Sequence, residues 1–159
     1  MNDLLPVAEQ VAALLRERRE TVAVAESSAG GLITAALLAV PNASAYCIGG
    51  IVLYTRQSWH ALRDFDDGLL GGVRAGTEAH ALIRAKLARD RFGAYWGIGE
   101  TGATGPTGNR YGDPAGHACL AVAGRTERTK TLETGVSDRV ANMHTFAAAA
   151  LNLLKDSLT

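Results

Sequence analysis

Short apolar runs alternate with amphipathic helical patterns along nearly the whole chain, and this alternation constrains the fold more than any other feature. The expected order is helix, strand, helix, strand, helix, strand, loop, strand, strand, helix. Strands that alternate with helices are typical of a largely parallel sheet with helices packed on it. Two consecutive late strands predict one antiparallel member. The pattern therefore predicts an α/β sandwich with a mixed sheet.

Pro, Gly and capping residues set the expected boundaries of these elements. A Gly-Gly pair at Gly49-Gly50 lies inside the second strand and predicts a bulge or a close backbone approach there. Ser137 is expected to cap the last helix. The predicted helices cover 4–17, 32–40, 77–92 and the segment after 137, the strands cover 21–25, 47–54, 94–98, 117–123 and 129–133, and a long loop covers 99–116.

Length and charge narrow the class of protein. The 159 residues are 47% hydrophobic, which suits one domain over 1–159. Sixteen basic and sixteen acidic residues give no basic excess, so we expect no nucleic-acid partner. No apolar run is long enough to span a membrane, and no signal peptide precedes the first helix, so we expect no membrane partner and a cytoplasmic location.

The cysteines and histidines give no metal-binding pattern. Cys47 and Cys119 each lie within an apolar run and are expected to be buried free thiols. No two histidines have the spacing of metal ligands, so we expect neither a metal nor another cofactor. His80 and His144 are expected on helix surfaces, and His60 is notable only because it follows the segment around Tyr54.

The turn between the first strand and the next helix carries an acid, two hydroxyls and two glycines. The first amides of a helix lack backbone partners and form a site that favours anions. Gly30 and Gly31 would let a ligand approach the backbone, and Ser27 or Ser28 is a candidate nucleophile at a strand end. The same residue types are also typical of an ordinary helix cap and turn.

Two further segments follow or flank strands. Four glycines and three threonines within Gly99–Asn109 predict a loop that lines an anion or nucleotide site, or else a glycine-rich surface excursion. Ser44 precedes the second strand, and Tyr54 ends it. Tyr54 either aims its hydroxyl into a cleft or is a half-buried core residue.

Taken in order, these segments resemble the C-terminal domain of the competence/damage-inducible protein CinA, which also occurs alone as nicotinamide mononucleotide amidohydrolase. The resemblance covers about residues 5–157 and implies a single CinA C-terminal-like domain. It further implies a three-layer α/β/α sandwich with a five-stranded mixed, mostly parallel sheet, and a homodimer. The matching segments are Ala25–Gly31, Asn42–Ala45, Gly49–Tyr54, Thr101–Pro106 and Pro114–Gly116.

The resemblance implies metal-free hydrolysis of a nucleotide carboxamide, with nicotinamide mononucleotide as the family's substrate. Ser27 is then the nucleophile, Ser44 and Tyr54 assist proton movement, and Glu26 also accepts hydrogen bonds that fix the turn. The residues expected to contact the substrate are Glu26, Ser28, Gly30, Gly31, Thr101, Gly102, Thr104, Gly105 and Arg139.

One departure opposes that chemistry. Active members of the family place a lysine five residues after the tyrosine, and that lysine works with the serine. Trp59 stands there in this chain, and an indole cannot accept a proton at neutral pH. The alternative is therefore a catalytically silent or repurposed domain that binds a nucleotide-like ligand or a protein partner. Arg110, Tyr111 and Asp113, in an inserted loop, would give a different ligand contact.

Overall fold

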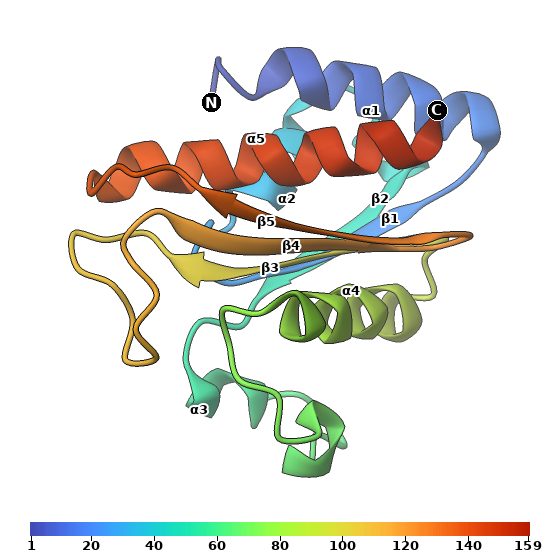
Figure 1. Cartoon of the computed structure of the whole chain (residues 1–159). Coiled ribbons are helices and arrows are strands. Elements are labelled where there is room, and N and C mark those ends of the chain that lie inside the picture. The colour runs from blue at the N-terminus through green and yellow to red at the C-terminus, as the bar shows by residue number, and fades with distance from the viewer.

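The structure, a computed structural model, covers all 159 residues and is a three-layer α/β/α sandwich. One mixed sheet lies between two layers of helices, and Figure 1 shows α1 and α5 on one side and α4 on the other. The elements are α1 Leu5–Arg18, β1 Val22–Glu26, α2 Leu32–Ala39, the 3₁₀ turn η1 Ala43–Ala45, β2 Cys47–Val52, α3 Arg56–Trp59, the 3₁₀ turn η2 Asp67–Leu70, α4 Glu78–Phe92, β3 Trp96–Ala103, β4 His117–Ala123, β5 Glu127–Glu133 and α5 Arg139–Leu158.

The sheet has the strand order β2-β1-β3-β4-β5. β1 pairs in parallel with both β2 and β3, whereas β4 is antiparallel to both of its neighbours. Four strands therefore run in one direction and β4 runs against them, which confirms the predicted single antiparallel member. The register between β1 and β2 skips Ile48, so the bulge predicted beside Gly49 is present.

Several boundaries differ from the prediction, among them the end of β3, the start of the following loop and the cap of α5. The strand expected to end at Ile98 continues to Ala103, because β3 pairs with β4 as far as Ala103 and His117. The loop predicted from Gly99 therefore begins only after β3. Asp138, not Ser137, caps α5, and its carboxylate accepts a hydrogen bond from the amide of Ala141 at 3.0 Å.

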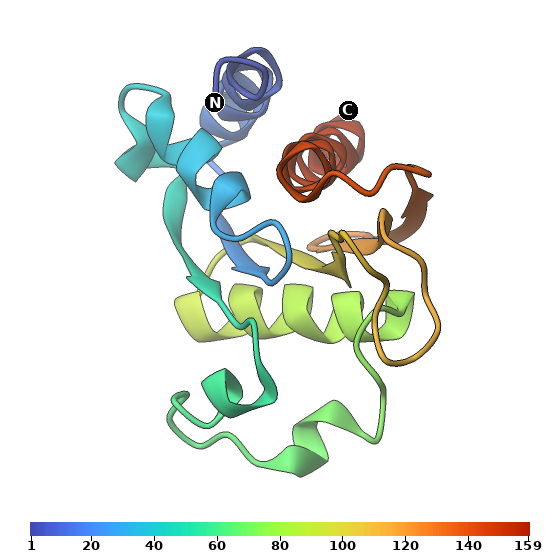
Figure 2. The same ribbon diagram turned by 90° about the vertical axis from the view of Figure 1, so that its left-hand side faces the viewer.

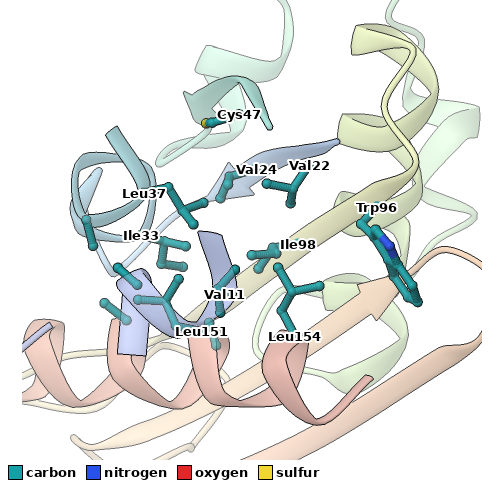
Figure 3. Packing of buried hydrophobic residues seen from close by; sticks show 14 of the residues in the cluster. Val11, Val22, Val24, Ile33, Leu37, Cys47, Trp96, Ile98, Leu151 and Leu154 are labelled. Carbon is teal, nitrogen blue, oxygen red and sulfur yellow. The ribbon is translucent and has the colours of Figure 1, made fainter. Parts of the chain in front are cut away.

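The main core lies between the sheet and the layer formed by α1, α2 and α5. Figure 3 shows Val24 and Ile98 of the sheet facing Ile33, Leu151 and other side chains of these helices. Cys47 belongs to this core, and both cysteines are buried free thiols, as predicted. No helix is both long and apolar enough to cross a bilayer.

The opposite face of the sheet packs against α4 through small residues. Ala81 and Ala85 of the helix meet alanines of the central strands. A methyl group built on Gly97 or Gly99 of β3 would overlap with the backbone of α4. The absence of side chains at these two glycines therefore allows the helix to lie unusually close to the sheet.

Candidate functional site

The candidate site lies at the edge of the sheet where β1, β2 and β3 end. The chain leaves β1 at Glu26, turns through Ser27 and Ser28, and enters α2. Gly30 and Gly31 both have positive φ angles, 68° and 99°, which a side chain would disfavour. The sharp turn therefore depends on these glycines.

Two buried carboxylates hold this turn. Glu26 accepts hydrogen bonds from the amides of Gly31, Ile33 and Thr34 at 3.0–3.1 Å, and from Oγ1 of Thr34 at 2.7 Å. The structure thus confirms that Glu26 fixes the turn. Burial raises the pKa of the Glu26 carboxyl, although these hydrogen bonds oppose the rise.

Glu100 of β3 is the second carboxylate. It accepts hydrogen bonds from the amides of Ser27 and Ala29, at 2.8 and 2.9 Å, and from the hydroxyl of Ser28. Because Glu26 and Glu100 accept hydrogen bonds from the amides around the start of α2, these amides already have partners. The expectation that Gly30 and Gly31 offer free amides to a phosphate was therefore wrong; the amide of Gly30 donates to the carbonyl of Ser27.

Ser27 has no base beside it. Its side chain is 7% exposed, and its hydroxyl makes no hydrogen bond to any residue. The only hydrogen bond that Ser27 makes to a side chain is the one from its amide to Glu100. The structure therefore shows no hydrogen-bonded pair of nucleophile and base at Ser27, the arrangement by which serine hydroxyls are activated.

Trp59, at the position of the family lysine, is a core residue. Its side chain is 3% exposed and packs with Leu53 and Leu70 beneath the end of β2. Its ring lies 5.5 Å from that of Phe65. The guanidinium of Arg84 lies over the Trp59 ring, 4.8 Å from its centroid. The cation near the lysine position thus comes from α4.

Arg84 and His80 form a buried pair one turn apart on α4. Nε of Arg84 donates to Nδ1 of His80 at 3.2 Å, and Nη1 of Arg84 donates to the carbonyl of Glu26 at 3.4 Å. Burial lowers the pKa of Arg84 to about 10, against the favourable field of Glu100, so the guanidinium is charged at neutral pH. Burial and the adjacent Arg84 lower the pKa of His80 to about 4, so its ring is neutral.

His80 is 3% exposed, so its expected place on a helix surface was wrong. It is buried because Trp59 and Arg84 cover it, and its ring meets Trp59 edge-on at 5.6 Å. His144 is only partly exposed and contacts Asp3 at 2.8 Å.

A polar hollow of about 230 Å³ opens beside the turn. Tyr54 is 58% exposed, which excludes the half-buried core alternative, and its hydroxyl accepts a hydrogen bond from Nη2 of Arg139 at 2.9 Å. Nη1 of Arg139 donates to the carbonyl of Gly105 at 2.7 Å. The residues that line this polar hollow are Ser28, Tyr54, Gly102, Ala103, Thr104, Gly105, Thr107, Gly108, Asn109 and Arg139.

Six of the twelve predicted site residues thus line the polar hollow, four lie in the turn from Glu26 to Gly31, and two, Thr101 and Ser44, lie elsewhere. Thr101 is buried in β3, where its hydroxyl accepts a hydrogen bond from the amide of Gly76 at 3.0 Å. Ser44 lies just before β2, whose first residue pairs with the start of β1. Ser27 follows the other end of β1, and the intervening strand rises by about 17 Å. Within one chain, Ser44 therefore cannot assist Ser27, and that expectation was wrong.

Sequence reasoning missed Glu100, Arg84 and His80. Glu100 and Arg84 have charged side chains, which usually lie at the surface, so the sequence did not indicate that they are buried. A spacing of four residues between His80 and Arg84 places them on one helix face and is the only signal that links them. No group of three or more His, Cys, Asp or Glu side chains is arranged to hold a metal.

The molecule is an α/β domain with a polar hollow at the carboxyl edge of parallel strands, the place where open α/β sheets usually bind ligands. Comparison with known proteins makes the class specific. The family described as CinA C-terminal domain matches residues 4–158. The chain therefore belongs to the CinA C-terminal domain family.

Relatives in both sequence and structure agree with that assignment. A CinA-like protein of Anaeromyxobacter sp. (strain K) is 39% identical over 99% of this chain, and one of Prochlorococcus marinus is 42% identical over 74%. The chain spans only 38% and 28% of those two relatives. A solved CinA superfamily protein from Klebsiella pneumoniae has a TM-score of 0.89 at 25% identity, with 98% of this chain and 97% of that chain covered.

Proposed function

We propose that this domain binds a small nucleotide-like anion in the polar hollow and lacks the serine-dependent amide hydrolysis that the resemblance implies. One observation carries the proposal. The hydroxyl of Ser27 forms no hydrogen bond to a basic nitrogen, and Trp59 occupies the lysine position as a buried core residue. In this proposal the polar hollow keeps its role in binding, whereas the residues needed for proton transfer at Ser27 are missing.

The chemistry of the polar hollow supports a ligand with phosphate and hydroxyl groups. Its lining combines the hydroxyls of Ser28, Thr107 and Tyr54 with a glycine-rich backbone and the guanidinium of Arg139. No carboxylate lines it. Arginine is well suited to phosphate because its planar fork donates two parallel hydrogen bonds.

Hydrolysis of a carboxamide is the second candidate, because the hydroxyl of Ser27 is not consumed by any hydrogen bond. Neither neighbouring nitrogen supplies a base, however. Arg84 holds its protons at neutral pH. Nδ1 of His80, the acceptor of the neutral ring, is already bonded to Arg84.

The test combines calorimetry with an ammonia assay on the purified protein and nicotinamide mononucleotide. We expect binding without ammonia release. Arg139→Gln should weaken binding at least tenfold, whereas Ser44→Ala, at the opposite edge of the sheet, should leave the affinity unchanged. Ammonia release that disappears in Ser27→Ala would overturn the proposal in favour of hydrolysis. Absence of both binding and release would refute both candidates.

Two expectations that the resemblance raises also stay proposals: a homodimer and a cytoplasmic location. The edge strand β2 supports the first, because its exposed side chains Ile48 and Val52 form apolar surface beside the exposed Leu38 of α2. Sedimentation equilibrium would measure the mass in solution, and a monomer at micromolar concentration would contradict the homodimer.

A further inference from the structure

A second hollow, of about 210 Å³, adjoins the polar hollow and shares Tyr54 with it. It lies on the α4 side of the sheet, where Figures 1 and 2 place the segment between β2 and α4. Aromatic side chains and arginines line it, and we call it the aromatic hollow. Its lining residues are Tyr54, Thr55, Arg56, Trp59, Leu70, Ala75, His80, Arg84, Arg110 and Tyr111.

The innermost groups of the aromatic hollow are two hydrogen-bond donors without protein partners. Arg84 is 2% exposed, yet it uses only Nε and Nη1 in hydrogen bonds, so Nη2 has none. His80 accepts at Nδ1, and its neutral ring therefore carries its proton on Nε2, which also has no partner. Neither donor is sealed from solvent, so both are open to the hollow that they line.

The charge of the aromatic hollow selects an anion. Three arginines line it, and no carboxylate does. Arg56 pairs with Asp67 at 3.1 Å outside the lining, whereas Arg110 forms no ion pair and donates to the hydroxyl of Tyr111 at 2.9 Å. A buried guanidinium without a carboxylate partner favours a ligand that carries the missing negative charge.

The shape of the group that meets the two donors is equally specific. A carboxylate presents two acceptor oxygens, one for each donor. A carboxamide presents one acceptor oxygen and an NH₂ group, which would face a donor and leave it unpartnered. A buried donor that is left without a partner keeps its full desolvation penalty, so the carboxylate is favoured even before its charge is considered.

Size and walls define the rest of the ligand. A cavity of about 150 Å³ holds benzene, so the aromatic hollow accommodates one six-membered ring with a carboxylate. Trp59, Tyr54 and Tyr111 contribute aromatic surface to the walls.

We propose that the aromatic hollow binds a monocyclic aromatic carboxylate. Its carboxylate accepts hydrogen bonds from Nη2 of Arg84 and Nε2 of His80, and its ring packs against the aromatic walls. Arg110 and Tyr111, from the loop between β3 and β4, also line it. This site does not depend on the ligand of the polar hollow, because none of its donors lines that hollow.

The test compares benzoate with benzamide, which differ only in the group that meets the donors. Isothermal titration calorimetry at pH 7 should give at least tenfold tighter binding for benzoate. Equal affinities in the unmodified protein would overturn the proposal, and this comparison needs no variant. Inorganic phosphate should not displace benzoate at equal concentration, and displacement would show a general anion site instead.

Variants then locate the site. Arg84→Met should reduce the preference for benzoate to less than threefold, while Arg84→Lys should keep part of it. The matched control Thr107→Val, at a residue that lines only the polar hollow, should leave benzoate affinity within twofold. Benzoate binding that survives in a folded Arg84→Met, judged by circular dichroism, would place the ligand elsewhere and refute the assignment. Failure of the benzoate measurements would refute the aromatic hollow alone, whereas failure of nicotinamide mononucleotide binding would refute the proposed function alone.

Discussion

Protonation of His80 should destabilise the fold in mild acid. Its imidazole is buried between Trp59 and the guanidinium of Arg84, and burial followed by that charge lowers its pKa from 6.5 to about 4. A group whose pKa is lower in the folded state favours the deprotonated form there. Its contribution to stability is therefore complete above pH 6.5 and is lost as the pH falls toward 4.

The size of the effect follows from these two pKa values. At pH 5 an unfolded histidine is almost fully protonated, whereas folded His80 remains mostly neutral. Each unit of pKa difference corresponds to about 1.4 kcal/mol, so the free energy of unfolding should fall by about 2 kcal/mol between pH 7 and pH 5. Because His80 borders a hollow, solvent screening makes this an upper value.

Urea unfolding of the unmodified protein and of His80→Gln at the two pH values measures this contribution. Glutamine keeps an acceptor for Nε of Arg84 and does not titrate. Burial lowers the pKa of His117, but hydrogen bonds to Glu133 and Gly76 outweigh it and leave the pKa raised. The contribution of His117 therefore has the opposite sign and is lost as the pH rises, but it is common to both proteins and cancels. A pH effect equal in both proteins, within about 0.5 kcal/mol, would refute the reasoning.

Three more predictions follow from the turn, the lysine position and the last helix. Glu26→Gln replaces one acceptor oxygen by an NH₂ group that faces backbone amides, and it should lower the free energy of unfolding by about 3 kcal/mol. The isosteric Thr34→Val removes a single hydrogen bond to Glu26 and should lower it by about 1 kcal/mol. Urea titrations of both variants measure these changes. Trp59→Lys alone should release no ammonia from nicotinamide mononucleotide, because the new ammonium group lies beside the positive charge of Arg84. Only the double variant Trp59→Lys with Arg84→Met should gain activity. Ammonia release by the single variant would contradict this prediction. Asp138→Ala removes a helix cap worth about 1 kcal/mol and should lower the melting temperature by about 2–4 °C in calorimetry, whereas an unchanged melting temperature would show that the cap contributes nothing.

The layers and most of the strands could be predicted from the sequence, because buried parallel strands are apolar and surface helices are amphipathic. The extent of β3 could not. Gly99 to Gly102 looks like a loop locally, but the segment is a strand because β4 pairs with it and α4 packs over its glycines. Tertiary contacts override local propensity there.

The candidate site was predicted where one local segment forms it and missed where distant segments do. The role of Glu26 follows from the turn that it precedes. Glu100 and Arg84 reach the same turn from other elements, and their burial depends on the partners that they find there. The prediction that Ser44 assists Ser27 was wrong for a related reason, because the order of motifs along the chain does not say at which edge of the sheet a residue lies.

The two glycines of β3 beneath α4 have a consequence for the electrostatics of the site. Arg84 reaches the carbonyl of Glu26 only because α4 lies so close to the sheet. A methyl group on Gly99, which is not in the site, would lift the helix and draw the buried positive charge away from the serine turn. The height of α4 above the sheet therefore sets the electrostatic potential at Ser27, and selection for that potential would act on Gly99, a residue that lines neither hollow.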